Sequence, residues 1–574
     1  MALLHFTDKT HDTVFLHSRF KMASAKGCDM DSILQALGPT GRYQMLQMIV
    51  SISPTLAAAI QLLGNVFICK DVPHHCTPPA TDSDFFSRFS NYTDVSYKYG
   101  ECSIAVFSNG SQLEHTPCVF GNSYSLPVSS SVVSEFDLVC EDAYLAKLSQ
   151  TLVIVGQGFG AVLITIVSDR LGRRPVLIAA NLGLLVCGLV VAYAPNFLVF
   201  AIFKFIIGGF QQGVLTGNYT YNAELFNRDS RRLNAVINKL FWALGVMLLP
   251  LISYLCKDLS WRSLQTVYCT LNITILLQIA LMDESIRWLL ANGKPNKAFK
   301  LIKKAARMNN VQLEKVMDAS AGSTVSSAKE ASSPSETNLT AVVLKKMTLL
   351  DILRIKRMLL NALTIWFAWF TVAISFFTIY LTSPNLAGDA YLNFFLISTM
   401  EIPPCFFLYF SFNRYGRRIT TAVFFLLVAM GLLTRGIFEA LTPDPVYDVI
   451  ILIATMVAMA GASGSFGCVF AYTPEMFPTN VRNQALGLSS CVCRIGGMLA
   501  PFTAVLAAAA AWAPGVLIGG MAIVVCVLMV FLPETYGREL PQTVEDLQRW
   551  YRAESPGDSS RTQTETGLLM KEKD

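Results

Sequence analysis

Charged side chains occur inside stretches of this chain that are otherwise apolar. Lys204, Lys239, Glu401, Arg435 and Arg494 all lie within such stretches. An ionisable group at the centre of a membrane costs about 3 kcal/mol or more, so it is retained mainly where it binds an ion or pairs with an opposite charge. These residues therefore predict the binding of charged solutes rather than bond-making chemistry.

Arg494 is the leading candidate for contact with a solute. It precedes Ile495-Gly496-Gly497, where absent side chains let helices approach closely. We interpret Arg494 as a fixed positive charge facing a central cavity, and the alternative is a buried structural ion pair. Arg435 and Glu439 stand one helical turn apart and are expected to neutralise each other. Lys204 is explained equally well by hydrogen bonds to neighbouring carbonyls.

Aromatic side chains supply the second half of the predicted binding site. Trp369 and Phe376 are seven residues apart, so they share one face of a helix. They could hold flat or cationic ligands by stacking and cation–π contact, or they could simply pack against other helices or lipid. Tyr219, Lys239 and Glu401 complete the set of candidate substrate contacts.

Other kinds of site do not fit the sequence. No Gly-rich loop ends in Gly-Lys followed by Ser or Thr, which excludes a nucleotide-driven motor. All six histidines lie outside the apolar stretches, which argues against an intramembrane metalloenzyme or acyltransferase. We therefore predict no enzymatic activity, no metal, no cofactor and no nucleic-acid partner. Coupling to Na⁺ or H⁺ stays open.

The elements that must position these residues are membrane-spanning helices. The chain has 574 residues, of which 53% are hydrophobic and 15% charged, and about 20 apolar residues suffice to cross a bilayer. Twelve windows meet this test: 43–68, 148–168, 175–194, 197–221, 233–255, 263–282, 358–381, 391–412, 419–441, 446–472, 485–510 and 513–532. The sequence therefore predicts an all-α membrane protein with twelve transmembrane helices.

The two halves of the chain repeat each other. Asp169-Arg170-Leu171-Gly172-Arg173-Arg174 lies between two apolar windows, and Asn413-Arg414-Tyr415-Gly416-Arg417-Arg418 has the same setting in the second half. Further pairs keep nearly the same offset: Glu224 and Arg231 with Glu475 and Arg482, and Asp283-Glu284-Ser285 with Pro533-Glu534-Thr535. Internal duplication is typical of transporters, so we predict two pseudo-symmetric bundles of six helices.

The arginines are confined to alternate loops. They follow even-numbered windows, while the other short loops carry little beyond Lys257. The positive-inside rule therefore places the arginine loops and both termini in the cytoplasm. Guanidinium groups there can reach carboxylates at neighbouring helix ends. We predict a cytoplasmic gate made of Asp169, Arg170, Arg173, Arg174, Glu224, Arg231, Arg414, Arg417, Arg418, Glu475 and Arg482.

The loop over 69–145 is too long and polar for the membrane. It carries Cys76, Cys102, Cys118 and Cys140, with glycosylation acceptor tripeptides at Asn91 and Asn109. Four cysteines in an oxidising compartment predict two disulfides, for which three pairings are possible. The positive-inside rule puts this loop outside the cell, which agrees with its cysteines and its glycosylation tripeptides.

The other segments complete the predicted organisation. They are a cytoplasmic N-terminus over 1–42, a first bundle over 43–282, a cytoplasmic loop over 283–357, a second bundle over 358–533 and a cytoplasmic tail over 534–574. Within the loop, basic and apolar residues alternate over 294–307 with helical spacing. This pattern predicts an amphipathic helix on the anionic inner leaflet, followed by a flexible linker over 319–340.

These motifs together resemble the major facilitator superfamily and, within it, the branch of organic cation, organic anion and carnitine transporters. The resemblance covers nearly the whole chain, and Asp283 and Asn413 depart from its usual Pro and Asp. Besides the Cys-bearing loop, three motifs carry the likeness to the branch: Ser134-Glu135-Phe136-Asp137-Leu138-Val139-Cys140, Asp283-Glu284-Ser285-Ile286-Arg287-Trp288-Leu289, and Glu475-Met476-Phe477-Pro478-Thr479-Asn480-Val481-Arg482-Asn483.

The resemblance implies a polyspecific plasma-membrane carrier of small organic ions that works by alternating access, and we expect it to function as a monomer. In similar proteins the positions matching Trp369, Phe376 and Glu401 face the substrate. Cation carriers have an acidic residue where this chain has Arg494, while anion and carnitine carriers have Arg. We therefore expect zwitterions such as carnitine, or organic anions. The alternatives are an organic cation carrier and, in another class, a non-transporting receptor or scaffold.

Overall fold

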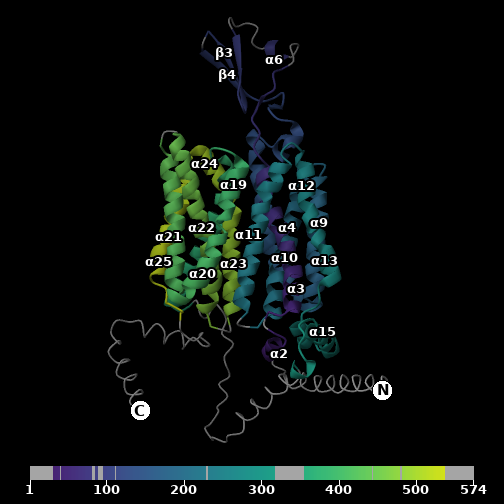
Figure 1. Ribbon diagram of the computed structural model, residues 1–574. Helices are drawn as coiled ribbons and strands as arrows, with labels where there is room; N and C mark the ends of the chain where they lie inside the picture. The colour runs from purple at the N-terminus through teal and green to yellow at the C-terminus, as the bar shows by residue number, and fades with distance from the viewer. Residues whose placement is uncertain are drawn as a thin grey trace, which may run out of the picture. The chain divides into compact units, whose positions relative to one another are not determined.

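The computed structural model describes residues 30–38, 40–79, 84–87, 95–109, 111–227, 230–316, 354–441, 444–478 and 481–536. The contacts divide the chain into two compact units, Met1–Ala331 and Ser332–Asp574. Long apolar helices make up most of each unit (Figure 1). The predicted linker over 319–340 and the tail from 541 lie outside the described residues.

The described residues of the first unit contain six helical spans, of which the first and sixth are interrupted. The first span consists of α3 (Arg42–Ile52), α4 (Pro54–Leu63) and α5 (Asn65–Ile68). Four continuous helices follow: α8 (Ala143–Leu171), α9 (Arg173–Ala192), α10 (Phe197–Leu225) and α11 (Arg231–Leu255). The sixth span consists of α12 (Trp261–Thr270), η3 (Leu271–Ile273) and α13 (Thr274–Leu281).

A small β lobe is inserted between the first and second spans (Figure 1). β2 (Val95–Tyr99), β3 (Ser103–Ser108) and β4 (Ser111–Pro117) form an antiparallel sheet in that order, and β1 (His74–Cys76) pairs with β5 (Asn122–Tyr124). Ile104 and Val106 alternate along β3 into a small core with Cys76 and Phe85. The helical turns of the loop are α6 (Asp84–Ser87), η1 (Val128–Ser130), α7 (Val132–Glu135) and η2 (Cys140–Asp142).

Short helices cover the opposite end of the first unit (Figure 1). They are α2 (Met30–Ala36), α14 (Ile286–Ala291) and α15 (Pro295–Met308). A helix is present at the predicted position as α15, whereas its expected place on the inner leaflet stays a prediction. Its apolar residues, including Phe299 and Ile302, are buried in one cluster with residues of α2, α3 and α14. Because that face is already covered by protein, it cannot insert into lipid.

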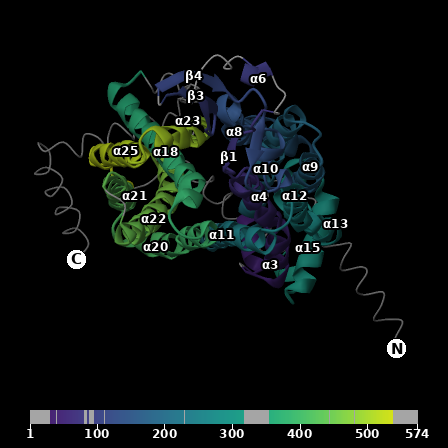
Figure 2. The ribbon, with the colours of Figure 1, turned by 90° about the horizontal axis from the view of Figure 1, so that it is seen from above.

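The second unit repeats this architecture without a β lobe in its described residues. Its helices are α18 (Lys356–Thr382), η4 (Ser383–Asn385), α19 (Ala390–Thr399), α20 (Ile402–Arg414), α21 (Arg417–Glu439), α22 (Pro445–Glu475), α23 (Arg482–Leu499), η5 (Ala500–Phe502), α24 (Thr503–Ala509) and α25 (Ala513–Met529). Figure 2 shows α21 between α22 and α25. The eighth span breaks at Glu401, before Pro403 and Pro404, which cannot donate a helical hydrogen bond.

The predicted spans are confirmed. Eleven helical segments in the described residues are long and apolar enough to cross a membrane, and the twelfth window corresponds to the shorter apolar helix α25. Most observed ends lie within about four residues of the predicted ones, but the second span begins at Cys140, before the predicted start at 148. Several boundaries coincide with charged residues such as Arg173 and Arg417.

Candidate functional site

The arginine turn of the first unit holds a compact set of charged residues, here called the first charge cluster: Asp169, Arg173, Glu224 and Glu284. The buried Arg173 donates from Nη2 to Glu224 Oε1 at 2.7 Å and from Nη1 to Asp169 Oδ1 at 2.8 Å. These bonds tie the end of α8 and the start of α9 to the end of α10. Such charge-assisted bonds are roughly twice as strong as neutral ones.

Glu284 has a separate role in this cluster. Its Oε1 accepts hydrogen bonds from the backbone N–H groups of Arg173, at 2.9 Å, and Arg174, at 3.3 Å. The carboxylate therefore caps the start of α9, where unsatisfied N–H groups and the helix dipole favour a negative charge. The preceding Gly172 has φ +111°, and a Cβ there would collide with this carboxylate, so glycine is required.

The second unit contains a matching set, here called the second charge cluster: Arg417, Glu475, Glu534 and Thr535. Arg417 Nε lies 3.2 Å from Glu475 Oε2. Glu534 accepts from the N–H groups of Arg417 and Arg418, at 2.8 and 3.1 Å, and so caps α21. Gly416 has φ +82° beside it. The sequence repeat therefore corresponds to matching side-chain contacts in the two units.

Tyrosines extend both clusters. Tyr221 donates to the carbonyl of Asp283 at 3.1 Å, and Tyr472 donates to the carbonyl of Pro533. Sequence reasoning missed these tyrosines and the capping role of Glu284 and Glu534. The sequence signal for the tyrosines was that Tyr221 precedes Glu224 by the same interval as Tyr472 precedes Glu475.

The remaining predicted gate residues take different positions. Arg170 and Arg414 are exposed, and Arg482 is half-buried at the start of α23. Arg174 donates to the carbonyl of Ile279, and Arg418 to that of Leu532. The Arg231 side chain lies outside the described part of the chain. The contacts of both clusters join helices within one unit, so their action as a gate stays a prediction.

Aromatic side chains of the second unit form a continuous series, here called the aromatic column: Trp369, Phe376, Tyr380, Phe394, Phe466 and Phe470. Trp369 contacts Phe470 with ring centroids 4.4 Å apart, and Phe376 contacts Phe466 at 5.3 Å. Trp369 Nε1 also donates to Thr473 Oγ1 at 2.9 Å. Trp369 and Phe376 thus share the face of α18 that packs against α22, as their spacing predicted.

The aromatic column ends at a buried acid. Phe376 contacts Tyr380 at 5.1 Å, and Tyr380 Oη donates to Glu401 Oε1 at 2.5 Å. Glu401 is fully buried at the break between α19 and α20. A polar group buried in this setting needs hydrogen-bond partners, and Tyr380 supplies one. The structure therefore joins Trp369, Phe376 and Glu401 through side chains that the sequence analysis did not select.

Arg494 lies half-buried on α23 in the same unit. Two residues further along, a Cβ on Gly496 would collide with the backbone carbonyl of Phe370 on α18. This close approach, predicted from the glycines, brings α23 against the helix that carries Trp369. The unit thus presents a cationic side chain on one helix and an aromatic column with a buried acid on its neighbours.

The other charged residues within the spans are distributed between the units. Arg435 Nε lies 2.8 Å from Glu439 Oε1, so the expected mutual neutralisation is present. The buried Lys204 lies over the ring of Phe200 at 5.3 Å. Lys239 is half-buried on α11, and Tyr219 on α10 is 65% exposed. A substrate role for Lys239 and Tyr219 stays a prediction.

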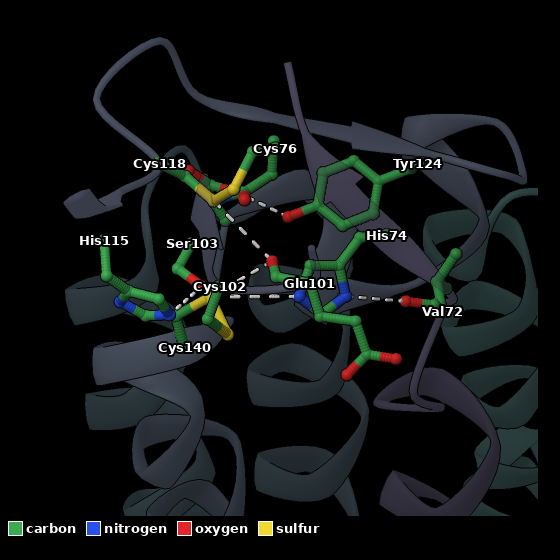
Figure 3. The surroundings of a disulfide bond; sticks show 12 residues. Val72, His74, Cys76, Glu101, Cys102, Ser103, His115, Cys118, Tyr124 and Cys140 are labelled. Carbon is green, nitrogen blue, oxygen red and sulfur yellow. Dashed lines mark hydrogen bonds between the residues drawn. A yellow bond between two sulfur atoms is a disulfide. The ribbon is translucent and has the colours of Figure 1, made fainter. Parts of the chain in front are cut away.

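The β lobe is held by two disulfides (Figure 3). Cys76 is bonded to Cys118 and Cys102 to Cys140, one of the three pairings left open by the sequence. His74 Nε2 lies 3.9 Å from Cys140 Sγ, but the disulfide removes the thiolates that a metal would need. Asn109 is exposed in the β3–β4 hairpin, whereas Asn91 lies outside the described residues. Glycosylation stays a prediction.

The motif around Glu135 attaches this lobe to the helices. Glu135 Oε1 accepts from Arg262 Nη2 at 2.6 Å, and Glu135 Oε2 accepts from Trp261 Nε1 at 2.5 Å. Arg262 also donates to the carbonyls of Ala192 and Ala194. The lobe is thereby fixed to the ends of α9 and α12.

Comparison with known families identifies the class of protein that carries this arrangement. Residues 80–547 match the family described as sugar (and other) transporter. Solute carrier family 22 member 3 of Rattus norvegicus is 30% identical over 448 residues, which cover 78% of this chain and 76% of that protein. The chain belongs to the sugar (and other) transporter family and, within it, to solute carrier family 22. It is therefore a membrane transporter rather than an enzyme, as predicted.

Other members of solute carrier family 22 match almost end to end. The organic cation transporter protein of Drosophila melanogaster is 28% identical over 94% of this chain and 98% of its own length. Organic anion transporter 3 of Sus scrofa is 27% identical over 91% of this chain and 94% of its own length. The inward-open xylose transporter XylE from E. coli covers 87% of this chain with a TM-score of 0.58 at 16% identity. That likeness confirms the major facilitator fold.

Proposed function

We propose that this chain carries small organic ions across the plasma membrane by alternating access and that it prefers substrates bearing a carboxylate, either organic anions or zwitterions such as carnitine. Its relatives are named for organic cations and for organic anions, so the family alone leaves the charge of the substrate open. The observation that carries our choice is Arg494, a cationic side chain in a span of the unit that also holds Glu401.

Arg494 and Glu401 are complementary in charge to the two ends of a zwitterion. Arg494 would attract a carboxylate and repel a simple cation, while Glu401 and the aromatic column would receive an ammonium group. Trp369 and Glu401 have no exposed surface in this structure. The proposal therefore requires that they become accessible in another access state, which substrate favours by its differential affinity.

The predicted orientation belongs to the same proposal. Asp142 precedes α8 and Asp169 lies near its end, and the 29 residues of this helix span about 43 Å. The disulfide lobe and the first charge cluster are thus at opposite ends of one span. We assign the lobe to the outside, and the arginine turns and both termini to the cytoplasm, following the positive-inside rule.

The charge clusters are assigned a mechanical role. Because each cluster joins helix ends of one unit, it would keep that unit rigid while access alternates. Arg170, Arg414 and Arg482, which lie outside the capped helix ends, are the candidates for contacts that close the cytoplasmic side.

A substrate panel tests the proposal. Cells that produce the protein should take up carnitine or an aromatic carboxylate faster than a quaternary ammonium compound, measured with and without Na⁺. Faster uptake of the quaternary ammonium compound would favour the organic cation alternative, for which Glu401 is the supporting feature. Absence of uptake for the whole panel from protein shown to be at the cell surface would favour a receptor or scaffold.

A further inference from the structure

A groove on the second unit lies apart from the aromatic column and meets the second charge cluster only at Arg418, whose backbone N–H donates to Glu534. It lies between α21 and α25, which are side by side in both views (Figures 1 and 2), and has a volume of about 260 Å³. Its lining is apolar except at one end, where Arg418 stands in the first turn of α21. The groove therefore has a cationic residue at one end and an apolar surface along the rest of its length.

The groove exists because two small side chains lie opposite each other. Cys526 Sγ is 3.3 Å from the carbonyl oxygen of Ala422, so the two helices are in close contact there. Around this floor the larger residues Ile419, Val423 and Val530 are 51%, 40% and 64% exposed. Large apolar side chains this exposed are expected where a spanning helix meets lipid, so the groove opens towards the bilayer.

Arg418 retains hydrogen-bonding capacity at the end of the groove. Its Nη1 donates to the carbonyls of Val530 and Leu532 at 3.4 and 3.3 Å. A guanidinium group has five N–H donors, and the described residues provide no acceptor for its Nε and Nη2. A planar fork of this kind is suited to phosphate oxygens.

We propose that this groove binds an anionic phospholipid, with one acyl chain between α21 and α25 and the phosphate on Arg418. The distance along α21 from Arg418 to Leu426 is about 12 Å, most of the roughly 15 Å depth of one leaflet's hydrocarbon. A phospholipid is the partner that offers a negative charge at the membrane surface and an apolar chain directly below it. In the proposed orientation this is the cytoplasmic leaflet, where anionic lipids are enriched.

Photo-crosslinking tests the site in the purified full-length protein, in nanodiscs doped with phosphatidylserine or phosphatidylcholine carrying a diazirine on the acyl chain. Mass spectrometry should find the crosslinks within 419–426 and 526–530. Phosphatidylserine should label about fivefold more than phosphatidylcholine, the factor that about 1 kcal/mol per basic residue represents. This readout does not depend on transport or on the orientation of the chain.

Three variants separate the parts of the proposal. Arg418→Gln should reduce phosphatidylserine labelling to the level of phosphatidylcholine. Ala422→Leu, which fills the floor without changing charge, should reduce labelling by both lipids. Arg174→Gln, at the matching position of the first unit, should leave labelling of the groove unchanged. Equal labelling of the groove by the two lipids in the unmodified protein, or full labelling in Ala422→Leu protein that elutes as a single folded peak, would overturn the proposal.

Discussion

Replacing Glu534 should strongly destabilise the second unit, although its carboxylate is only half-buried. Its oxygens accept four backbone N–H groups, two from the start of α21 and two from Thr535 and Tyr536. A hydrogen bond to a charged group contributes about 1.5–3 kcal/mol. Taking the lower value for each of the two bonds that cap α21, because the site is partly exposed, Glu534→Ala should cost about 3 kcal/mol.

Thermal unfolding of the purified protein in detergent measures this loss. For a unit of this size about 1 kcal/mol shifts Tm by roughly 2–4 °C, so Glu534→Ala should lower Tm by about 6–12 °C. Glu534→Gln keeps one acceptor oxygen and should lose about half as much. Asp448→Ala, at an exposed carboxylate of the same unit, is the matched control and should shift Tm by about 2 °C or less. A Tm for Glu534→Ala no lower than that of the control would refute the capping role.

Three further predictions concern other residues. Gly416→Ala should reduce folded protein at the cell surface, because a positive φ costs a side-chain residue about 1–2 kcal/mol and the added Cβ meets Glu534; surface biotinylation measures it, and wild-type levels would contradict it. Glu401→Gln should reduce uptake of a quaternary ammonium compound about tenfold relative to an aromatic carboxylate, a loss of about 1.4 kcal/mol; equal effects on both would remove Glu401 from the substrate site. Asn109→Gln should remove one glycan, seen as a smaller endoglycosidase-sensitive shift on a gel, and an unchanged shift would show that Asn109 is not modified.

The sequence predicted the spans because their signal is local. Runs of apolar residues bounded by charges fix where a helix crosses the membrane, and the seven-residue spacing of Trp369 and Phe376 fixes their common face. The same periodicity assigned an apolar face to α15 but could not show what covers it, and protein rather than lipid does so.

Contacts between residues that are far apart in the chain could not be predicted from the sequence. Glu284 caps a helix that begins more than a hundred residues earlier, and nothing in the local pattern marks its partner. Phe466 and Phe470 resembled ordinary residues of an apolar span until the packing of α22 on α18 placed them beside Phe376 and Trp369. The disulfide pairing likewise depends on the three-dimensional path of the β lobe, since the order of four cysteines permits three solutions.

The charge at position 494 is the feature on which the proposed substrate preference depends most directly. The decisive measurement is the uptake ratio of carnitine or an aromatic carboxylate to a quaternary ammonium compound, in cells producing the wild type or Arg494→Asp at matched surface levels. Our account predicts a ratio above one for the wild type and a fall of roughly tenfold or more in the variant, because the sign of the charge offered to the carboxylate is reversed. An unchanged ratio in Arg494→Asp would contradict it.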